Sequence, residues 1–214
     1  DRKLKRVSIG GASEVQVIAD AAGGGGGTWS AGDVILFAAG IEGPLSRVLA
    51  SGGGMAAVTT LDPARRESGH FWPQFLPDGR HYVYEQLAAD TSGLYVGDLD
   101  SKDRTRLVGW TSMVDNTMPR YANGHLFYTQ KQSLVAQRFD VRQLRTEAEP
   151  VRLADGIDVA GPGYAAFAVT DTTLAYREST RVVSQLTWID RRGQSVGTLG
   201  TPIVTEGHAI SPDG

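Results

Sequence analysis

The chain has 214 residues, of which 41% are hydrophobic, and its formal net charge at neutral pH is −3. This size and composition are enough to bury a core without covalent staples. Because the chain has no cysteine, disulfides and thiolate ligands are excluded. The nearly balanced charge makes nucleic acid an unexpected partner. No apolar run reaches the roughly 18 to 20 residues of a membrane span, so we predict no membrane segment in this chain.

The first predicted elements are two short strands, Leu4–Ile9 and Val15–Ile18. They have the pattern of the third and fourth strands of a four-stranded unit whose first two strands are missing. Five glycines, Gly23–Gly27, follow and lead into another strand, Val34–Ala39. A loop that cradles phosphate needs a helix after its glycines, so this order of elements argues against nucleotide binding.

The clearest unit is residues 68–108, which contains four short runs rich in aromatic and β-branched residues. Gly, Pro, Asp or Ser separates each run from the next, which predicts four antiparallel strands joined by tight turns. Pro77–Gly79 supplies the residue types that reverse the chain between the first and second strands. The alternation of a strand then puts Tyr82 and Tyr84 on one face and Val83 on the other.

The same pattern recurs about every 45 residues along the chain. The turn between first and second strands is marked at Asp33, Gly79, Gly124, Thr173 and Gly214. The start of the third strand is marked at Leu4, Leu45, Leu94, Leu134 and Leu186. Four-stranded repeats of this length are typical of propeller blades. The sequence therefore predicts an all-β fold, a β-propeller of four-stranded antiparallel blades.

We predict four complete blades, with partial blades at both termini, in a single propeller domain or a fragment of one. The complete blades cover residues 26–62, 68–108, 113–155 and 162–200, and residues 3–18 and 203–214 contribute a partial blade. The aromatic residues expected between blades are Trp29, Trp72, Phe75, Phe127, Phe139 and Trp188. Because the last residues, Pro212–Gly214, form a turn that should lead into another strand, we expect a segment of a larger protein.

PDGRHYVY at Pro77–Tyr84, SPDG at Ser211–Gly214 and the leucine that opens each third strand resemble the TolB-like, WD40-like β-propeller repeats. The chain looks most like the repeats found C-terminal to bacterial serine/threonine protein kinases, in which segments such as GGTWS, VTTLDPAR and FLPDGRH recur. The resemblance implies a non-catalytic interaction or sensor module, an extracytoplasmic location and a kinase domain elsewhere in the parent protein. The Gly-rich, HRD and DFG segments of a kinase are absent from this sequence.

The loops that lead into the first strand of each blade are expected to surround one mouth of a central channel. We predict a ligand-binding site there, formed by His70, Trp72, Asp115, Tyr164 and His208. The expected partner is a protein, a peptide or a small ligand, bound through aromatic anchors. Two histidines and an acid can hold a divalent metal, but their spacing matches no metal motif, so we predict no metal and no cofactor.

Each of these loops also carries an acid, and converging carboxylates suit glycoside chemistry as general acid and base. The acids are Asp20, Glu67, Asp115, Asp158 and Glu206. The alternative function is therefore a carbohydrate-active propeller enzyme, with Asp115 and Glu206 as the preferred pair. Because acids in loops are ordinarily solvated, we expect a binding module and no enzyme activity within this chain.

Gly193–Gly197 matches the G-x-S-x-G pattern of hydrolase nucleophiles. That chemistry requires a strand, a strained elbow and a helix. Short strands flank Ser195 on both sides in this sequence, so we predict a hairpin rather than a nucleophile elbow.

Overall fold

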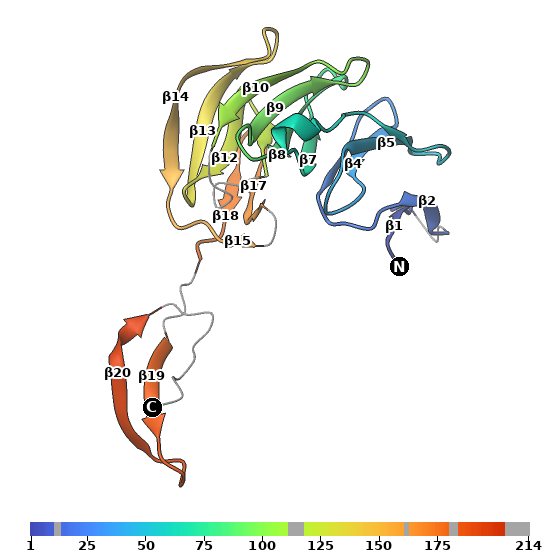
Figure 1. Cartoon of the computed structure of the whole chain (residues 1–214). Coiled ribbons are helices and arrows are strands. Elements are labelled where there is room, and N and C mark those ends of the chain that lie inside the picture. Colours follow the sequence, from blue (N-terminus) through green and yellow to red (C-terminus); the bar gives the residue numbers. More distant parts are fainter. Residues whose placement is uncertain (11–13, 111–117, 161–162, 180–183, 204–214) are drawn as a thin grey trace. The chain divides into compact units, whose positions relative to one another are not determined.

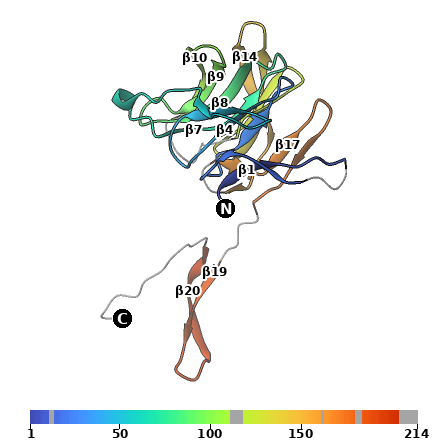
Figure 2. The same cartoon turned by 90° about the vertical axis from the view of Figure 1, so that its right-hand side faces the viewer.

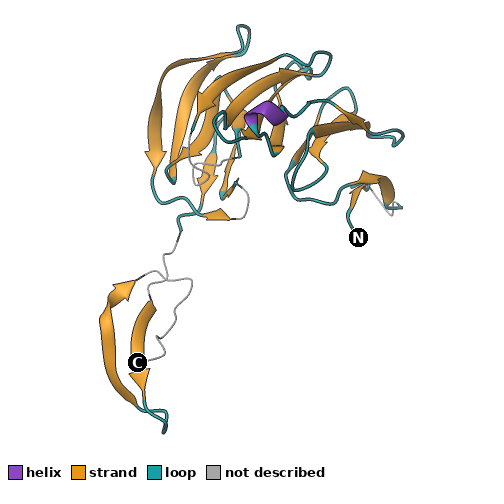
Figure 3. Cartoon of the chain, in the orientation of Figure 1, coloured by secondary structure: helices purple, strands orange, loops and turns teal. Residues whose placement is uncertain are grey.

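The computed structural model describes residues 1–10, 14–110, 118–160, 163–179 and 184–203. The chain divides into two compact units, Asp1–Glu178 and Ser179–Gly214. The described residues form strands and turns, with one short 3-10 helix at Pro63–Arg65 and no α-helix (Figures 1 and 3). The predicted all-β class is therefore confirmed. None of the described segments is a helix long and apolar enough to cross a membrane.

Three four-stranded sheets contain most of the strand residues described in the first unit. Sheet I comprises β3 (Gly27–Trp29), β4 (Val34–Ala38), β5 (Leu45–Leu49) and β6 (Ala56–Ala57). Sheet II comprises β7 (Gly69–Phe75), β8 (His81–Leu87), β9 (Gly93–Asp98) and β10 (Arg104–Gly109). Sheet III comprises β11 (Arg120–Ala122), β12 (His125–Gln130), β13 (Ser133–Asp140) and β14 (Arg145–Ala154). In each sheet the strands lie in chain order and neighbours are antiparallel, as predicted.

The turn between β7 and β8 has the geometry that its residues favour. Gly79 has a φ of +68°, and its N–H donates to the carbonyl of Leu76 over 2.9 Å. The Asp78 carboxylate accepts from the backbone N–H groups of Arg80 and His81, at 3.0 and 2.9 Å. Glycine adopts positive φ without steric cost, and aspartate caps its own turn. The predicted hairpin at this position is confirmed.

Sheet II is covered on both faces because its strands alternate. Tyr82 and Tyr84 pack in one buried cluster with Leu36 of sheet I, whereas Val83 packs in another with Leu126 of sheet III. The two views of the chain show β4, β7 and β8 close together, and β4 and β7 are in contact (Figure 2). The predicted division of these side chains between two faces is confirmed, and each face meets a neighbouring sheet.

Hydrogen bonds join β3 to β7 and β7 to β11, which are the first strands of the three sheets, and a further pair joins two turns. The links are Phe75 to Thr28, Gln74 to Tyr121, and Asn123 to Asp171 in the turn between β17 and β18. The linked residues are 47, 47 and 48 positions apart. Hydrogen bonds between successive segments therefore recur at nearly the period that the sequence shows.

Two-stranded sheets make up the other described strands. β1 (Lys3–Arg6) pairs with β2 (Gln16–Asp20), as predicted for the opening residues. Further along, β15 (Val159–Ala160) pairs with β16 (Tyr164–Ala165), and β17 (Phe167–Val169) pairs with β18 (Leu174–Tyr176). In the second unit, β19 (Ser184–Ile189) pairs with β20 (Ser195–Ile203). The turn between these last strands is closed by Asp190 and Gln194, so the hairpin predicted around Ser195 is confirmed.

The described strands of the stretch predicted as a fourth blade, residues 162–200, belong to three two-stranded sheets, and β16 pairs with β15 in the first of them. β17 and β18 belong to the first unit, and β19 and β20 belong to the second. The grouping of these four strands into one blade stays a prediction. Residues 204–214, which belong to the predicted partial blade, lie outside the described residues.

Burial is confirmed for four of the six aromatic residues that we expect between blades. Trp72, Phe75, Phe127 and Phe139 are buried, or partly buried against the hydrophobic clusters. The prediction is wrong for Trp29, which is 52% exposed. Trp188 is 45% exposed and lies in the second unit, so its place between blades stays a prediction. Trp29 lines an open hollow of about 520 Å³ beside Leu4. Trp188 lies in a two-stranded sheet, and the described part of its unit contains no second sheet to cover it.

Candidate functional site

Trp72 lies at an irregular point of β7. The pairing of β7 with β8 shifts between Phe71 and Gln74, and Trp72 has a φ of +53°. Its backbone N–H leaves the β7–β8 ladder and donates to the carbonyl of Gly25 over 2.6 Å. A tryptophan at positive φ is strained, and strain of this kind clusters at functional sites.

The glycine run before β3 explains how this backbone fits. A Cβ on Gly26 would lie 2.5 Å from Cε3 of Trp72, and a Cβ on Gly25 would lie 2.7 Å from Cδ1 of Phe71. Gly26 itself has a φ of +80°. These glycines allow the chain to approach two aromatic rings more closely than any other residue type would. Their role here is in packing.

Trp72 and Tyr164, two of the predicted ligand-binding residues, lie together. Their ring centroids are 6.0 Å apart and the rings are inclined at 53°. Trp72 is 8% exposed, whereas Tyr164, at the start of β16, is 47% exposed. The pair therefore forms a partly open aromatic surface fixed to a buried base.

Arg120, at the start of β11, is linked to this aromatic pair through Met118 and through an electrostatic interaction with Tyr164. Its Nη1 donates to the carbonyl of Pro119 at 3.1 Å, and its Nη2 donates to Sδ of Met118 at 2.7 Å. Met118 belongs to the same buried cluster as Trp72. Burial lowers the pKa of Arg120, and the electrostatic interaction with Tyr164 acts in the opposite direction.

His70 precedes Trp72 by two residues and has no exposed surface. Its Nδ1 lies 2.7 Å from Oγ1 of Thr59, and its Nε2 lies 3.3 Å from Nη1 of Arg104. A guanidinium can only donate, so Nε2 must accept and Nδ1 carries the ring proton. Burial, with a further contribution from the Arg104 charge, lowers the pKa of His70 to about 3, while a hydrogen bond with Gln86 opposes this shift. His70 is therefore neutral at physiological pH.

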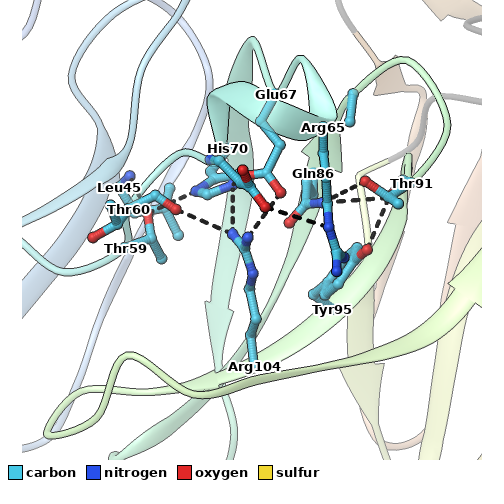
Figure 4. A network of polar contacts seen from close by, with 12 residues as sticks. Leu45, Thr59, Thr60, Arg65, Glu67, His70, Gln86, Thr91, Tyr95 and Arg104 are labelled. Atoms are coloured by element: carbon cyan, nitrogen blue, oxygen red, sulfur yellow. Dashed lines mark hydrogen bonds and ion pairs between the residues drawn. The ribbon is translucent and has the colours of Figure 1, made fainter.

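The same network contains a buried ion pair (Figure 4). Oε1 of Glu67 accepts from Nη2 of Arg104 over 2.7 Å, and Oε2 accepts from the backbone N–H of Asp62 over 2.7 Å. Arg104 also donates to the carbonyl of Thr60 at 3.2 Å. Arg104 comes from the last strand of sheet II, and Thr60 follows the last strand of sheet I. The network thus links the two sheets.

This placement gives His70 a different role from the one predicted. His70 is predicted as a ligand contact, but its side chain has no surface on which a ligand can lie. It positions β7, and so the strained backbone of Trp72, from inside the protein. Two other predicted site residues, Asp115 and His208, lie outside the described residues, as does Glu206.

The described acids of the predicted glycoside site are all engaged in ion pairs. Asp20 pairs with Lys3, Glu67 with Arg104, and Asp158 with Arg177. These contacts are structural, and they offer no support for a glycoside mechanism. Across the described part of the chain, no group of three or more His, Cys, Asp or Glu side chains is placed to hold a metal ion.

Arg104 and Arg120 are the site residues that sequence reasoning misses. Arg104 lies 37 residues from Glu67 and 34 from His70, so their contact depends on the packing of different strands. Arg120 begins a short strand, and from the sequence it resembles an ordinary solvent-exposed arginine at a strand end. The only sequence feature that points to Arg120 as a site residue is its position at the start of the first strand of sheet III.

No protein-family model matches the chain, and no curated protein matches it. The function is therefore inferred from the residues of the site themselves.

Proposed function

We propose that sheets I, II and III are consecutive blades of a β-propeller, and that this propeller is a non-catalytic module that binds a protein, a peptide or a small ligand. Two observations support the arrangement of blades. Both faces of sheet II are covered by neighbouring sheets, and hydrogen bonds between successive segments recur 47, 47 and 48 residues apart. Blades that are apolar on both faces bury them by stacking around an axis.

The contact between Trp72 and Tyr164 carries the proposal of binding. In a propeller, the residues that lead into the first strands surround one mouth of the channel. Arg120 and Tyr164 are the first residues of their strands, and Trp72 lies at the irregular middle of β7. The aromatic pair supplies contact area on a rigid base, which is the usual character of a binding anchor.

The proposal also covers the setting of the module. The segments GGTWS, VTTLDPAR and FLPDGRH resemble the TolB-like, WD40-like repeats that follow bacterial serine/threonine kinase domains. On that resemblance, the module is extracytoplasmic and senses a ligand or partner for an attached kinase.

Selection from a displayed random peptide library, with this chain immobilised, tests the binding proposal. We expect enriched peptides whose binding is weakened by Tyr164→Ala. Val151→Ala is the matched control, because Val151 is 62% exposed on the last strand of sheet III and should leave binding unchanged. Equal effects of the two substitutions, or turnover of oligosaccharides by the chain, would contradict a peptide-binding role for this face.

A further inference from the structure

Arg120 is a partly buried cation without a carboxylate partner among the described residues. A guanidinium has five N–H donors, and within the described part of the chain the side-chain hydrogen bonds of Arg120 go to the Pro119 carbonyl and the Met118 sulfur. Neither group carries a charge. Arg104 provides the contrast, because it meets the carboxylate of Glu67 at 2.7 Å.

Burying a charge without a counter-charge is unfavourable. The lowered pKa of Arg120 has burial as its main cause and agrees with this description. A bound anion would therefore stabilise the Arg120 guanidinium at this position. The positive charge of Arg120 has no described counter-charge. Its neighbour Met118 is well packed and only 4% exposed.

The neighbouring rings indicate what the rest of a ligand would be. Tyr164 is 47% exposed and its ring lies 6.0 Å from that of Trp72. A flat apolar group can stack on such a surface while an attached anion reaches Arg120. A planar guanidinium matches a carboxylate through two parallel hydrogen bonds.

We propose that Arg120, Tyr164 and Trp72 form a binding site for a carboxylate attached to a flat apolar group, such as a small aromatic acid or the C-terminal residue of a peptide. Arg120 binds the carboxylate, and the two aromatic side chains contact the apolar group. This inference rests on the proposed binding function and specifies its ligand class.

Calorimetric titration with matched probes tests the ligand class. The probes are 3-phenylpropionate, its neutral amide, a peptide ending in phenylalanine as the free acid, the same peptide amidated, and inorganic phosphate. We expect the acids to bind and the amides and phosphate to bind at least about tenfold more weakly, because a hydrogen-bonded charge pair is lost or mismatched. The two acids separate a small-molecule source from a peptide source. Equal binding of acid and amide would overturn the carboxylate inference and leave the binding function intact, whereas no binding by any probe or selected peptide would contradict both.

Substitutions test the residue assigned to the charge. Arg120→Gln should weaken binding of the acid by at least about tenfold, and Arg120→Lys should weaken it less. Arg152→Gln is the control, because Arg152 is exposed on sheet III and pairs with Asp155. An acid affinity that is unchanged in Arg120→Gln would overturn the inference.

Thermal unfolding of the ligand-free protein supplies a second, independent readout. Removing an unpaired, partly buried charge in Arg120→Met should leave the Tm unchanged or raise it. A clear fall in Tm would mean that Arg120 already has a counter-charge within the protein, which would contradict the proposed site.

Discussion

The carboxamide of Gln74 and the backbone of Tyr121 form a closed pair of hydrogen bonds. The Tyr121 N–H donates to Oε1 of Gln74 at 2.6 Å, and Nε2 of Gln74 donates to the Tyr121 carbonyl at 3.2 Å. A single side chain of sheet II thus satisfies both backbone groups of a residue on the edge strand of sheet III. It joins two sheets through the first strand of each.

Replacing Gln74 with leucine should lower the free energy of unfolding by about 2 kcal/mol, because two partly buried backbone groups of Tyr121 lose their partners. Gln143→Leu, in the exposed turn between β13 and β14, should change it by less than about 0.5 kcal/mol. Urea unfolding of both variants measures the difference. Identical midpoints for the two would show that the Gln74 contact does not couple the sheets.

Two glycines of the run before β3 differ in the space around them, so one substitution can serve as the control for the other. Gly26→Ala should destabilise the protein by about 2 kcal/mol or more, since the new Cβ would lie 2.5 Å from the Trp72 ring and the residue has a φ of +80°. Gly24→Ala should be neutral or slightly stabilising, because no atom lies within 4 Å of its Cβ position. Thermal unfolding compares them. Equal Tm values would contradict the close packing of this loop against Trp72.

His70 should make stability depend on pH in a defined direction. Its pKa is about 3 in the folded protein against an ordinary value of 6.5, so below pH 6.5 the unfolded chain binds the proton more readily. Acidification from pH 7.5 to pH 5 should therefore lower the free energy of unfolding by about 2 kcal/mol through this residue alone. The groups around the ring are Glu67, Arg104 and Gln86.

Comparison with His70→Gln isolates that contribution. Denaturant unfolding of both proteins at pH 7.5 and pH 5 should show a smaller loss for the variant, because glutamine does not titrate. Parallel losses in the two proteins would mean that His70 is not held neutral by its surroundings.

The ion pair between Glu67 and Arg104 should be strongly coupled. Glu67→Gln or Arg104→Met alone should cost about 2 to 3 kcal/mol, somewhat below the range for fully buried pairs because the Arg104 side chain is 23% exposed. The double variant should lose less than the sum of the two single losses, since it leaves no unpaired charge. A double-mutant cycle by urea unfolding measures this coupling, and strict additivity would exclude an energetic pair.

The sheets and turns are readable from the sequence because the signals are local. The alternation of side chains along a strand puts Tyr82 and Val83 on opposite faces. The turns need positive φ at Gly79 and Gly124, and glycine is the residue type that tolerates it. Trp29 shows where this reasoning ends. Its spacing matches a core position, but whether a neighbouring sheet covers it depends on how different segments pack.

The site is predictable only in part for the same reason. Trp72 and Tyr164 are identified by their places near the starts of strands, but their contact is a property of packing. His70 has the sequence features of a ligand contact, yet Thr59 and Arg104, 11 and 34 residues away, occupy its ring nitrogens. For Arg104 and Arg120, no feature of the neighbouring sequence distinguishes a buried guanidinium from a solvated one.

The radial arrangement of the sheets is tested most directly by spin-label distances between sheets I and III. The chain has no cysteine, so label pairs can be introduced without background. One pair, Ala31→Cys with Asn123→Cys, lies in the turns after the first strands, and the other, Ala56→Cys with Val151→Cys, lies on the last strands. Blades around an axis predict a clearly longer separation for the last-strand pair, because blades diverge outward. Equal separations for the two pairs would contradict the propeller.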